Sequence, residues 1–203
     1  MNSASKHRRN IFFAAAVSSL CGSASGLTLS QEIVNPANGH KYVLLDASDW
    51  STAQTEAVSL GGTLAIINDA SEQSWVYSTF STFASQKRNL WIGLYDPDPI
   101  VNSINTETRR TEFRWVDGSQ VSFTAWAGIE PNNPSLPEFF VHIWNPNDPH
   151  AGKWNNLVNS DSVFGIPVNG VVEISAVPEP QSFLLMALGF ATILTFRRKA
   201  AIE

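Results

Sequence analysis

Cysteine and positive charge are both scarce in this sequence of 203 residues. The single cysteine, Cys21, excludes an intramolecular disulfide framework and any cysteine-rich zinc site. Charged residues make up only 15% of the chain, and residues 26–176 hold seven basic against sixteen acidic side chains, a net charge of −9. This acidic balance argues against a nucleic-acid partner, which needs a basic surface, and it permits cation binding.

Apolar runs are concentrated at the two ends of the chain. At the N-terminal end, Lys6, Arg8 and Arg9 precede the mostly apolar residues 11–20, and small residues follow up to Ser25. This order is typical of a secretory signal peptide that is cleaved after residue 24 or 25. A buried N-terminal helix is the structural alternative. We therefore predict that residues 1–25 are a signal peptide.

The C-terminal end has three parts: the proline-rich residues 177–180 (VPEP), the apolar residues 183–196 and the basic residues 197–199. The apolar run is shorter than the roughly 20 residues that span a bilayer comfortably. This order resembles the PEP-CTERM sorting signal of Gram-negative bacteria. The resemblance implies a sorting segment at 177–203 with a short transmembrane helix, and export through the inner membrane. It also implies processing by an exosortase-type protease and delivery to the cell surface or extracellular matrix.

The body, residues 26–176, has a common size for one domain. Residues 41–45 are typical of a strand, and apolar residues at 50, 53, 57 and 60 recur with the period of a helix. Ser48 or Asp49 can cap this helix, and Asp69 with Glu72 predicts the start of a second one. After residue 90 the segments become short, aromatic and interrupted by turn residues. The pattern predicts an α+β domain with two helices, short antiparallel strands and a long loop region.

Two polar segments of the body stand out. Residues 96–111 are predicted to be a mobile loop, in which Arg109 and Arg110 form a solvated surface. Residues 127–137 contain three prolines together with Glu130 and Asn132, between Trp126 and an apolar run. Proline restricts the backbone, so we predict that this second segment is a rigid, presented loop.

Several motifs, in this order, resemble the C-type lectin-like domain: WIGL at 91–94, FRWVDGS at 113–119, Glu130-Pro131-Asn132, Glu138 and Trp154-Asn155. The resemblance spans residues 41–173 and implies the C-type lectin-like fold. The family usually carries disulfides, whereas this body has none. Phe140 and Val172 stand about where cysteines are expected. The resemblance therefore predicts a domain that depends on core packing alone.

The resemblance also implies a functional site. Calcium would be held by Glu130, Asn132, Glu138, Asn155 and Asn156, with a cis bond before Pro131. Sugar hydroxyls would complete the metal shell and bind Glu130, Asn132, Glu138 and Asn155. The Glu-Pro-Asn order resembles that of family members that take mannose, glucose or N-acetylglucosamine. The implied partner is a polysaccharide or glycan of the extracellular matrix.

One residue departs from the family pattern at this site. The family motif Trp-Asn-Asp is here Trp154-Asn155-Asn156, which keeps an oxygen ligand but removes a negative charge. Ligand charge helps to set calcium affinity, so the site is expected to be weak unless Asp161 compensates from the next loop. A plain Pro/Asn turn is the structural alternative for residues 130–132. The functional alternative is a structural or protein-interaction module of the extracellular matrix that does not bind sugar.

Two glutamates near the site are compatible with an enzymatic alternative. Glu130 and Glu138 form a conceivable glycosidase pair. Nothing else in the loop indicates a cleft that holds an acid of raised pKa. We therefore predict that the chain is not an enzyme.

Overall fold

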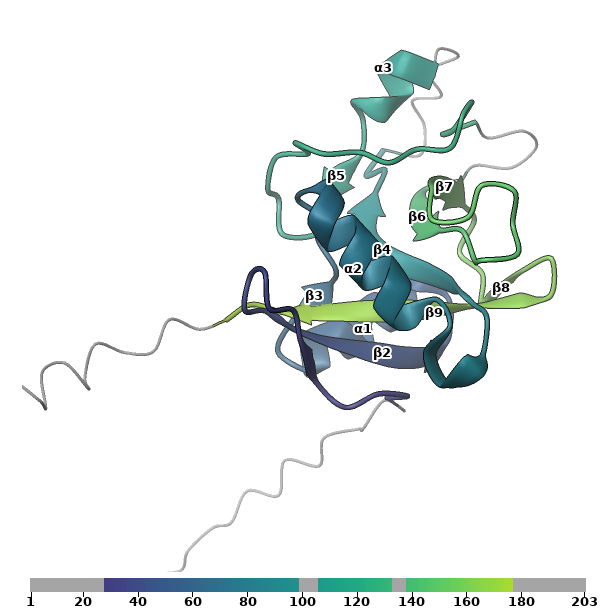
Figure 1. Ribbon diagram of the computed structural model, residues 1–203. Helices are drawn as coiled ribbons and strands as arrows, with labels where there is room; N and C mark the ends of the chain where they lie inside the picture. Colours follow the sequence, from purple (N-terminus) through teal and green to yellow (C-terminus); the bar gives the residue numbers. More distant parts are fainter. Residues whose placement is uncertain (1–27, 99–105, 133–137, 177–203) are drawn as a thin grey trace, which may run out of the picture.

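The computed structural model describes residues 28–98, 106–132 and 138–176 (Figure 1). The predicted signal peptide and sorting segment, Cys21 included, lie outside these residues. Within them, no helix is long and apolar enough to cross a membrane. The elements are β1 (Ile33–Val34), β2 (Lys41–Ala47), α1 (Trp50–Ser59), β3 (Thr63–Leu64), α2 (Ala70–Phe80), the 3-10 turn η1 (Phe83–Ser85), β4 (Asn89–Tyr95), α3 (Thr106–Arg110), β5 (Arg114–Trp115), β6 (Phe140–Ile143), β7 (Trp154–Leu157), β8 (Ser162–Val163) and β9 (Ile166–Ile174).

The strands form one mixed sheet with the order β1-β2-β9-β4-β6-β7. Neighbouring strands are antiparallel except for β4 and β9, which are parallel. The short strands β3 and β8 pair with β9, and β5 pairs with β4. Because β2 pairs with β9, the first long strand and the last strand of the body lie side by side, as Figure 1 shows. The α+β class and its short strands agree with the sequence prediction.

The two predicted helices begin at the predicted caps. The Asp49 side chain accepts a hydrogen bond from Thr52 N at 2.9 Å, which satisfies a free donor in the first turn of α1. The apolar stripe of α1 is buried, as its period predicts. Asp69 caps α2 by accepting from Glu72 N at 2.9 Å. The Glu72 carboxylate does not complete a capping box, because it accepts from Asn68 N and from the Tyr42 hydroxyl instead.

Aromatic side chains fill the core in place of disulfides. Trp91, Trp115 and Trp154 are fully or almost fully buried. Phe140 stacks on Trp50 with ring centroids 4.6 Å apart, and the Val172 side chain is buried in the same cluster. The positions where the family resemblance predicts cysteines are thus occupied by apolar core side chains. The residues that the structure describes contain no cysteine.

The glycine of the WIGL motif is required by close backbone packing. A Cβ atom at Gly93 would lie 2.6 Å from the Leu64 carbonyl oxygen and 2.9 Å from Val116 Cγ2. Gly93 N donates to the Ala65 carbonyl at 2.8 Å, and its carbonyl accepts from Val116 N at 2.9 Å. This glycine therefore allows β4 to lie directly against the segment that contains β3.

The polar stretch that was predicted to be a mobile loop contains the short helix α3. The prediction that Arg109 is solvated is wrong, since this side chain is only 6% exposed. Arg110, also predicted to be solvated, is half-buried and donates hydrogen bonds to two backbone carbonyls of the 127–137 loop. These long-range contacts give α3 a fixed place that its own polar composition does not predict.

Candidate functional site

Three segments supply the residues that the sequence places at the site. Glu130 and Asn132 belong to the loop between β5 and β6, Glu138 lies just before β6, and Asn155 and Asn156 are in β7. An isolated bridge between Trp126 and Trp154 joins the start of the loop to β7. The antiparallel pairing of β6 with β7 fixes the second half of the site. The Glu130–Pro131 bond is cis, as the resemblance implies.

Hydrogen bonds connect all five predicted residues. Asn132 N donates to Asn156 Oδ1 at 3.2 Å, and Asn156 Nδ2 donates to the Glu138 carbonyl at 2.8 Å. Asn132 Nδ2 donates to Glu130 Oε1 at 2.6 Å. Asn155 Nδ2 donates to the Asn156 carbonyl at 2.7 Å. The structure therefore brings these residues together, although they come from separate parts of the chain.

Two oxygen atoms of the site are buried and lack a hydrogen-bond donor among the described residues. They are Glu130 Oε2 and Asn132 Oδ1. A buried acceptor without a partner is unfavourable, so this pair is complementary to a cation or to a donor from a ligand. No three His, Cys, Asp or Glu side chains cluster as a metal centre in the described part of the chain. The two buried oxygens belong to a carboxylate and an amide, the kinds of ligand that calcium binds.

The loop is held from outside by Arg110. Its Nε and Nη2 donate to the Glu130 carbonyl at 2.9 and 2.7 Å, and Nη2 also donates to the Gly128 carbonyl at 3.1 Å. Burial raises the pKa of the Glu130 carboxyl, while the charges of His150 and Arg110 act to lower it. Sequence analysis misses Arg110 because its acceptors are backbone carbonyls about twenty residues away, which have no sequence signature.

His142 also contributes to the site without a signal in the sequence. Its Nε2 lies 3.1 Å from Asn155 Nδ2. Burial lowers the pKa of His142 to about 3, so the neutral ring accepts a hydrogen bond from the Asn155 amide. Asn155 thereby directs both amide hydrogens inward, to His142 and to the Asn156 carbonyl. Its Oδ1 is then the group that remains for a ligand.

Asp161 does not compensate for the missing carboxylate at position 156 in this structure. Its side chain is exposed and accepts from the Ser162 hydroxyl at 3.1 Å. Asn156 itself is completely buried and is part of the hydrogen-bond network of the site. Of the five predicted site residues, two therefore carry a carboxylate and three carry an amide.

A mixed sheet with a long loop that brings carboxylate and amide side chains together is the framework of a binding domain, and the related lectin domains are non-enzymatic binding proteins. Residues 46–163 match the Lectin C-type domain family, and the chain belongs to that family. Members of this family generally bind calcium. Residues 176–199 match the PEP-CTERM protein-sorting motif, which implies export through the inner membrane of a Gram-negative bacterium.

Relatives include the C-type mannose receptor 2 of Homo sapiens, which is 34% identical over 134 residues. This match covers 64% of the chain but only 8% of the receptor. The perlucin-like protein of Mytilus galloprovincialis is 30% identical over 120 residues, which cover 58% of the chain and 68% of that protein.

Solved structures show the same fold. The C-type lectin CEL-I from Cucumaria echinata is 26% identical with a TM-score of 0.50, covering 66% of this chain and 89% of its own. The cow CD23 carbohydrate-recognition domain, at 23% identity, has a TM-score of 0.51 and covers 68% of this chain and 90% of its own.

Proposed function

We propose that the chain is an exported, calcium-dependent carbohydrate-binding module for mannose- or glucose-type sugars. The observation that carries this proposal is the pair of buried, unpartnered oxygens, Glu130 Oε2 and Asn132 Oδ1, within a connected set of oxygen-bearing side chains. Oxygen ligands from carboxylates and amides suit calcium. Members of the lectin family generally bind calcium, which supports the same assignment.

Calcium would be held by Glu130, Asn132, Glu138, Asn155 and Asn156. When bound, it would supply coordination positions for two neighbouring sugar hydroxyls. The Glu130 carboxylate would accept a hydrogen bond from one hydroxyl. Asn132 has one amide hydrogen beyond the one donated to Glu130, and this hydrogen would be donated to the sugar. Asn155 would act through its oxygen alone, because its amide hydrogens are directed inward.

The preference for mannose-type sugars is supported by the Glu130-Pro131-Asn132 order and by the names of relatives. These include the C-type mannose receptor 2 of Homo sapiens and a mannose-binding lectin isoform of the snake Notechis scutatus scutatus. The names describe those proteins. For this chain they support testing sugars with the hydroxyl arrangement of mannose first.

The proposed partners follow from the two ends of the chain. We infer a signal peptide at 1–25, the lectin domain at 26–176 and a sorting segment at 177–203 that an exosortase-type protease processes. The PEP-CTERM match supports this route. The domain would then reach the cell surface or extracellular matrix and bind a polysaccharide or glycan there. Display of many copies would raise the avidity of a weak single site.

A glycan array tests the proposal directly. The full chain is applied with calcium and, separately, with a chelator. Mannose-type signals are expected with calcium only. Glu130→Gln is expected to abolish these signals. Glu32→Gln is the matched control: it makes the same change at a half-exposed glutamate that pairs with Lys41, and it should keep the signals. Equal signals with calcium and with chelator would rule out the calcium mechanism.

Asn156 favours a second candidate function, a structural or protein-interaction module without sugar binding. The amide at this position removes one negative charge from the family's calcium site, and the fold alone does not settle function. Calorimetric titration with calcium separates the two candidates. Absence of binding heat at high calcium concentration would favour the structural module.

A further inference from the structure

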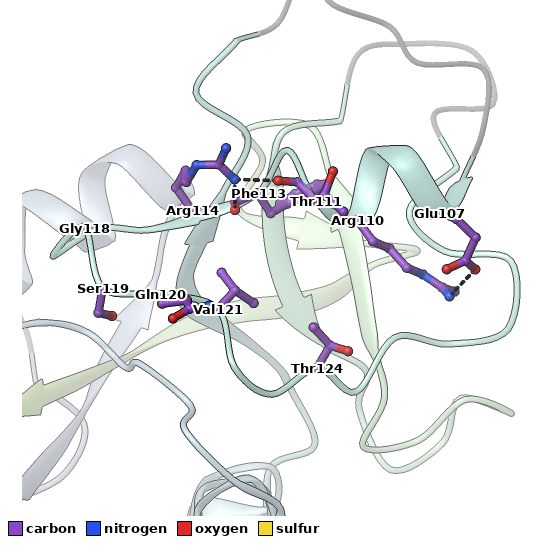
Figure 2. A pocket seen from close by; sticks show the side chains of 10 residues that line it. All are labelled: Glu107, Arg110, Thr111, Phe113, Arg114, Gly118, Ser119, Gln120, Val121 and Thr124. Atoms are coloured by element: carbon purple, nitrogen blue, oxygen red, sulfur yellow. Dashed lines mark hydrogen bonds and ion pairs between the residues drawn. The ribbon is translucent and has the colours of Figure 1, made fainter.

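A groove adjoins the candidate site through Arg110. It has a volume of about 670 Å³ and is lined by α3, β5 and residues 118–124. Figure 2 shows its side chains, which include Arg110, Arg114, Gln120 and Thr124. Arg110 is shared by the groove and the candidate site, because it lines the groove and donates to the Glu130 carbonyl. Arg110 therefore joins the wall of the groove to the loop that carries Glu130.

The groove has the opposite charge to the rest of the domain. Residues 26–176 carry a net charge of −9, yet the groove is lined by two arginines and one glutamate. The glutamate, Glu107, pairs with Arg110 Nη1 at 2.8 Å. Arg114 is the second cation of the groove wall; its side chain is exposed, and it also lines a neighbouring hollow together with Asp96, Asp98 and Glu112. Within the lining of the groove itself the arginines outnumber the glutamate, and this balance favours an anionic ligand there.

Arg114 is oriented by its own backbone neighbours. Its Nη1 donates to the carbonyls of Thr111 and Phe113, at 2.5 and 2.8 Å. Its Nε and Nη2 make no hydrogen bond within the described part of the chain. These two nitrogens lie along one edge of the guanidinium plane, which is the arrangement that binds a carboxylate or sulfate through two parallel hydrogen bonds.

The other polar side chains of the groove suit sugar hydroxyls. Ser119, Gln120 and Thr124 are exposed, and their side-chain groups make no hydrogen bond within the described residues. Phe113 and Val121 add apolar surface to the lining. Hydroxyl and amide groups beside a guanidinium provide donors and acceptors for a sugar ring that carries an acidic group.

We propose that this groove binds an anionic sugar residue next to the sugar held at Glu130, so that the ligand is an acidic polysaccharide. The inference rests on the proposed function for the position of the neighbouring sugar. The acidic group is a carboxylate, as in a uronate, or a sulfate. Both would use the same edge of Arg114.

The test compares three tetrasaccharides on the full chain by calorimetry: neutral mannotetraose, tetramannuronate and sulfated mannotetraose. With calcium, at least one acidic ligand is expected to bind about tenfold tighter than the neutral one, and added salt should reduce this preference. The tighter of the two acidic ligands identifies the acidic group.

Arg114→Gln is expected to remove the preference for acidic ligands without changing affinity for the neutral ligand. Arg114→Lys should restore only part of it, because a lysine provides charge without the paired donors. Lys41→Gln removes the same charge from β2, far along the chain from the groove, and should have no effect. A thermal melt of each variant confirms that it is folded.

The outcomes separate the two proposals. Equal binding of acidic and neutral ligands by the unchanged chain, or an acidic preference that persists in Arg114→Gln, would overturn the groove assignment and leave the calcium site standing. Acidic binding that survives chelation and is lost in Arg114→Gln would support the groove and refute the calcium site. Absence of binding in every arm refutes both.

Discussion

Asn156→Asp restores the carboxylate of the family motif and should change the protein in opposite directions without and with calcium. Asn156 is completely buried, and its Nδ2 donates to the Glu138 carbonyl at 2.8 Å. An aspartate would lose this donor and place a carboxylate against a carbonyl oxygen. Leaving a buried polar group unsatisfied costs about 1–3 kcal/mol, so the variant should be less stable without calcium.

With calcium the substitution should have the opposite effect on stability, because the added carboxylate becomes a calcium ligand. If the unchanged site has a Kd of about 1 mM, the weak end of extracellular modules, then 10 mM calcium stabilises the fold by about 1.4 kcal/mol. A tenfold tighter site in Asn156→Asp gives about 2.7 kcal/mol at the same concentration. For a domain of this size, 1 kcal/mol corresponds to roughly 3 °C in Tm.

The assay is a thermal melt in chelator and in 10 mM calcium. Calcium should raise the Tm of the unchanged chain by about 4 °C and that of Asn156→Asp by about 8 °C, from a lower starting value. Asn147→Asp is the matched control, because it adds the same charge at an exposed residue outside the site. Equal calcium shifts for the unchanged chain and Asn156→Asp would refute the reasoning.

Three further predictions concern stability and the site. Gly93→Ala should destabilise the fold by several kcal/mol in urea unfolding, since its Cβ would contact a β3 carbonyl oxygen at 2.6 Å, whereas Gly128→Ala, in open space, should have little effect. His142→Leu should weaken calcium binding about tenfold in calorimetry by freeing the Asn155 amide, and His142→Gln should restore it in part. Burial raises the pKa of Glu173 above 4.5, so its stabilising effect is full below that pH and is lost as pH rises through the folded-state value. Glu173→Gln should therefore gain stability relative to the unchanged chain as the pH rises above 4.5 in urea unfolding.

The elements that local physics determines could be predicted from the sequence. Asp49 and Asp69 cap helices with the expected hydrogen bonds, and the period of apolar residues in α1 identifies its buried face. The order of motifs placed Glu130 and Asn156 in one site, because the family fold fixes how the loop meets β7. In each case the information lies within a few residues or in a motif with a known arrangement.

The contacts that sequence analysis missed are all long-range and non-periodic. Arg110 lies in a polar stretch and is fixed by carbonyls of another loop. His142 becomes a partner of Asn155 only through the register of β6 against β7. The Glu72 carboxylate leaves its expected capping role because Tyr42, thirty residues earlier, offers a buried hydroxyl. Propensity and spacing contain no information on such pairs.

The two unusual residues of the site act in the same direction on calcium. Asn156 removes a negative charge from the ligand set, and Arg110 places a positive charge against the loop that carries Glu130. Both lower the attraction for a divalent cation, so a single domain should bind calcium and sugar weakly. Weak sites become effective when many copies face a polymer with repeated units, because linked binding events multiply the apparent affinity. A sorting segment that concentrates the domain at a surface would supply that density, and an acidic polymer would add a second contact at Arg114 for each copy.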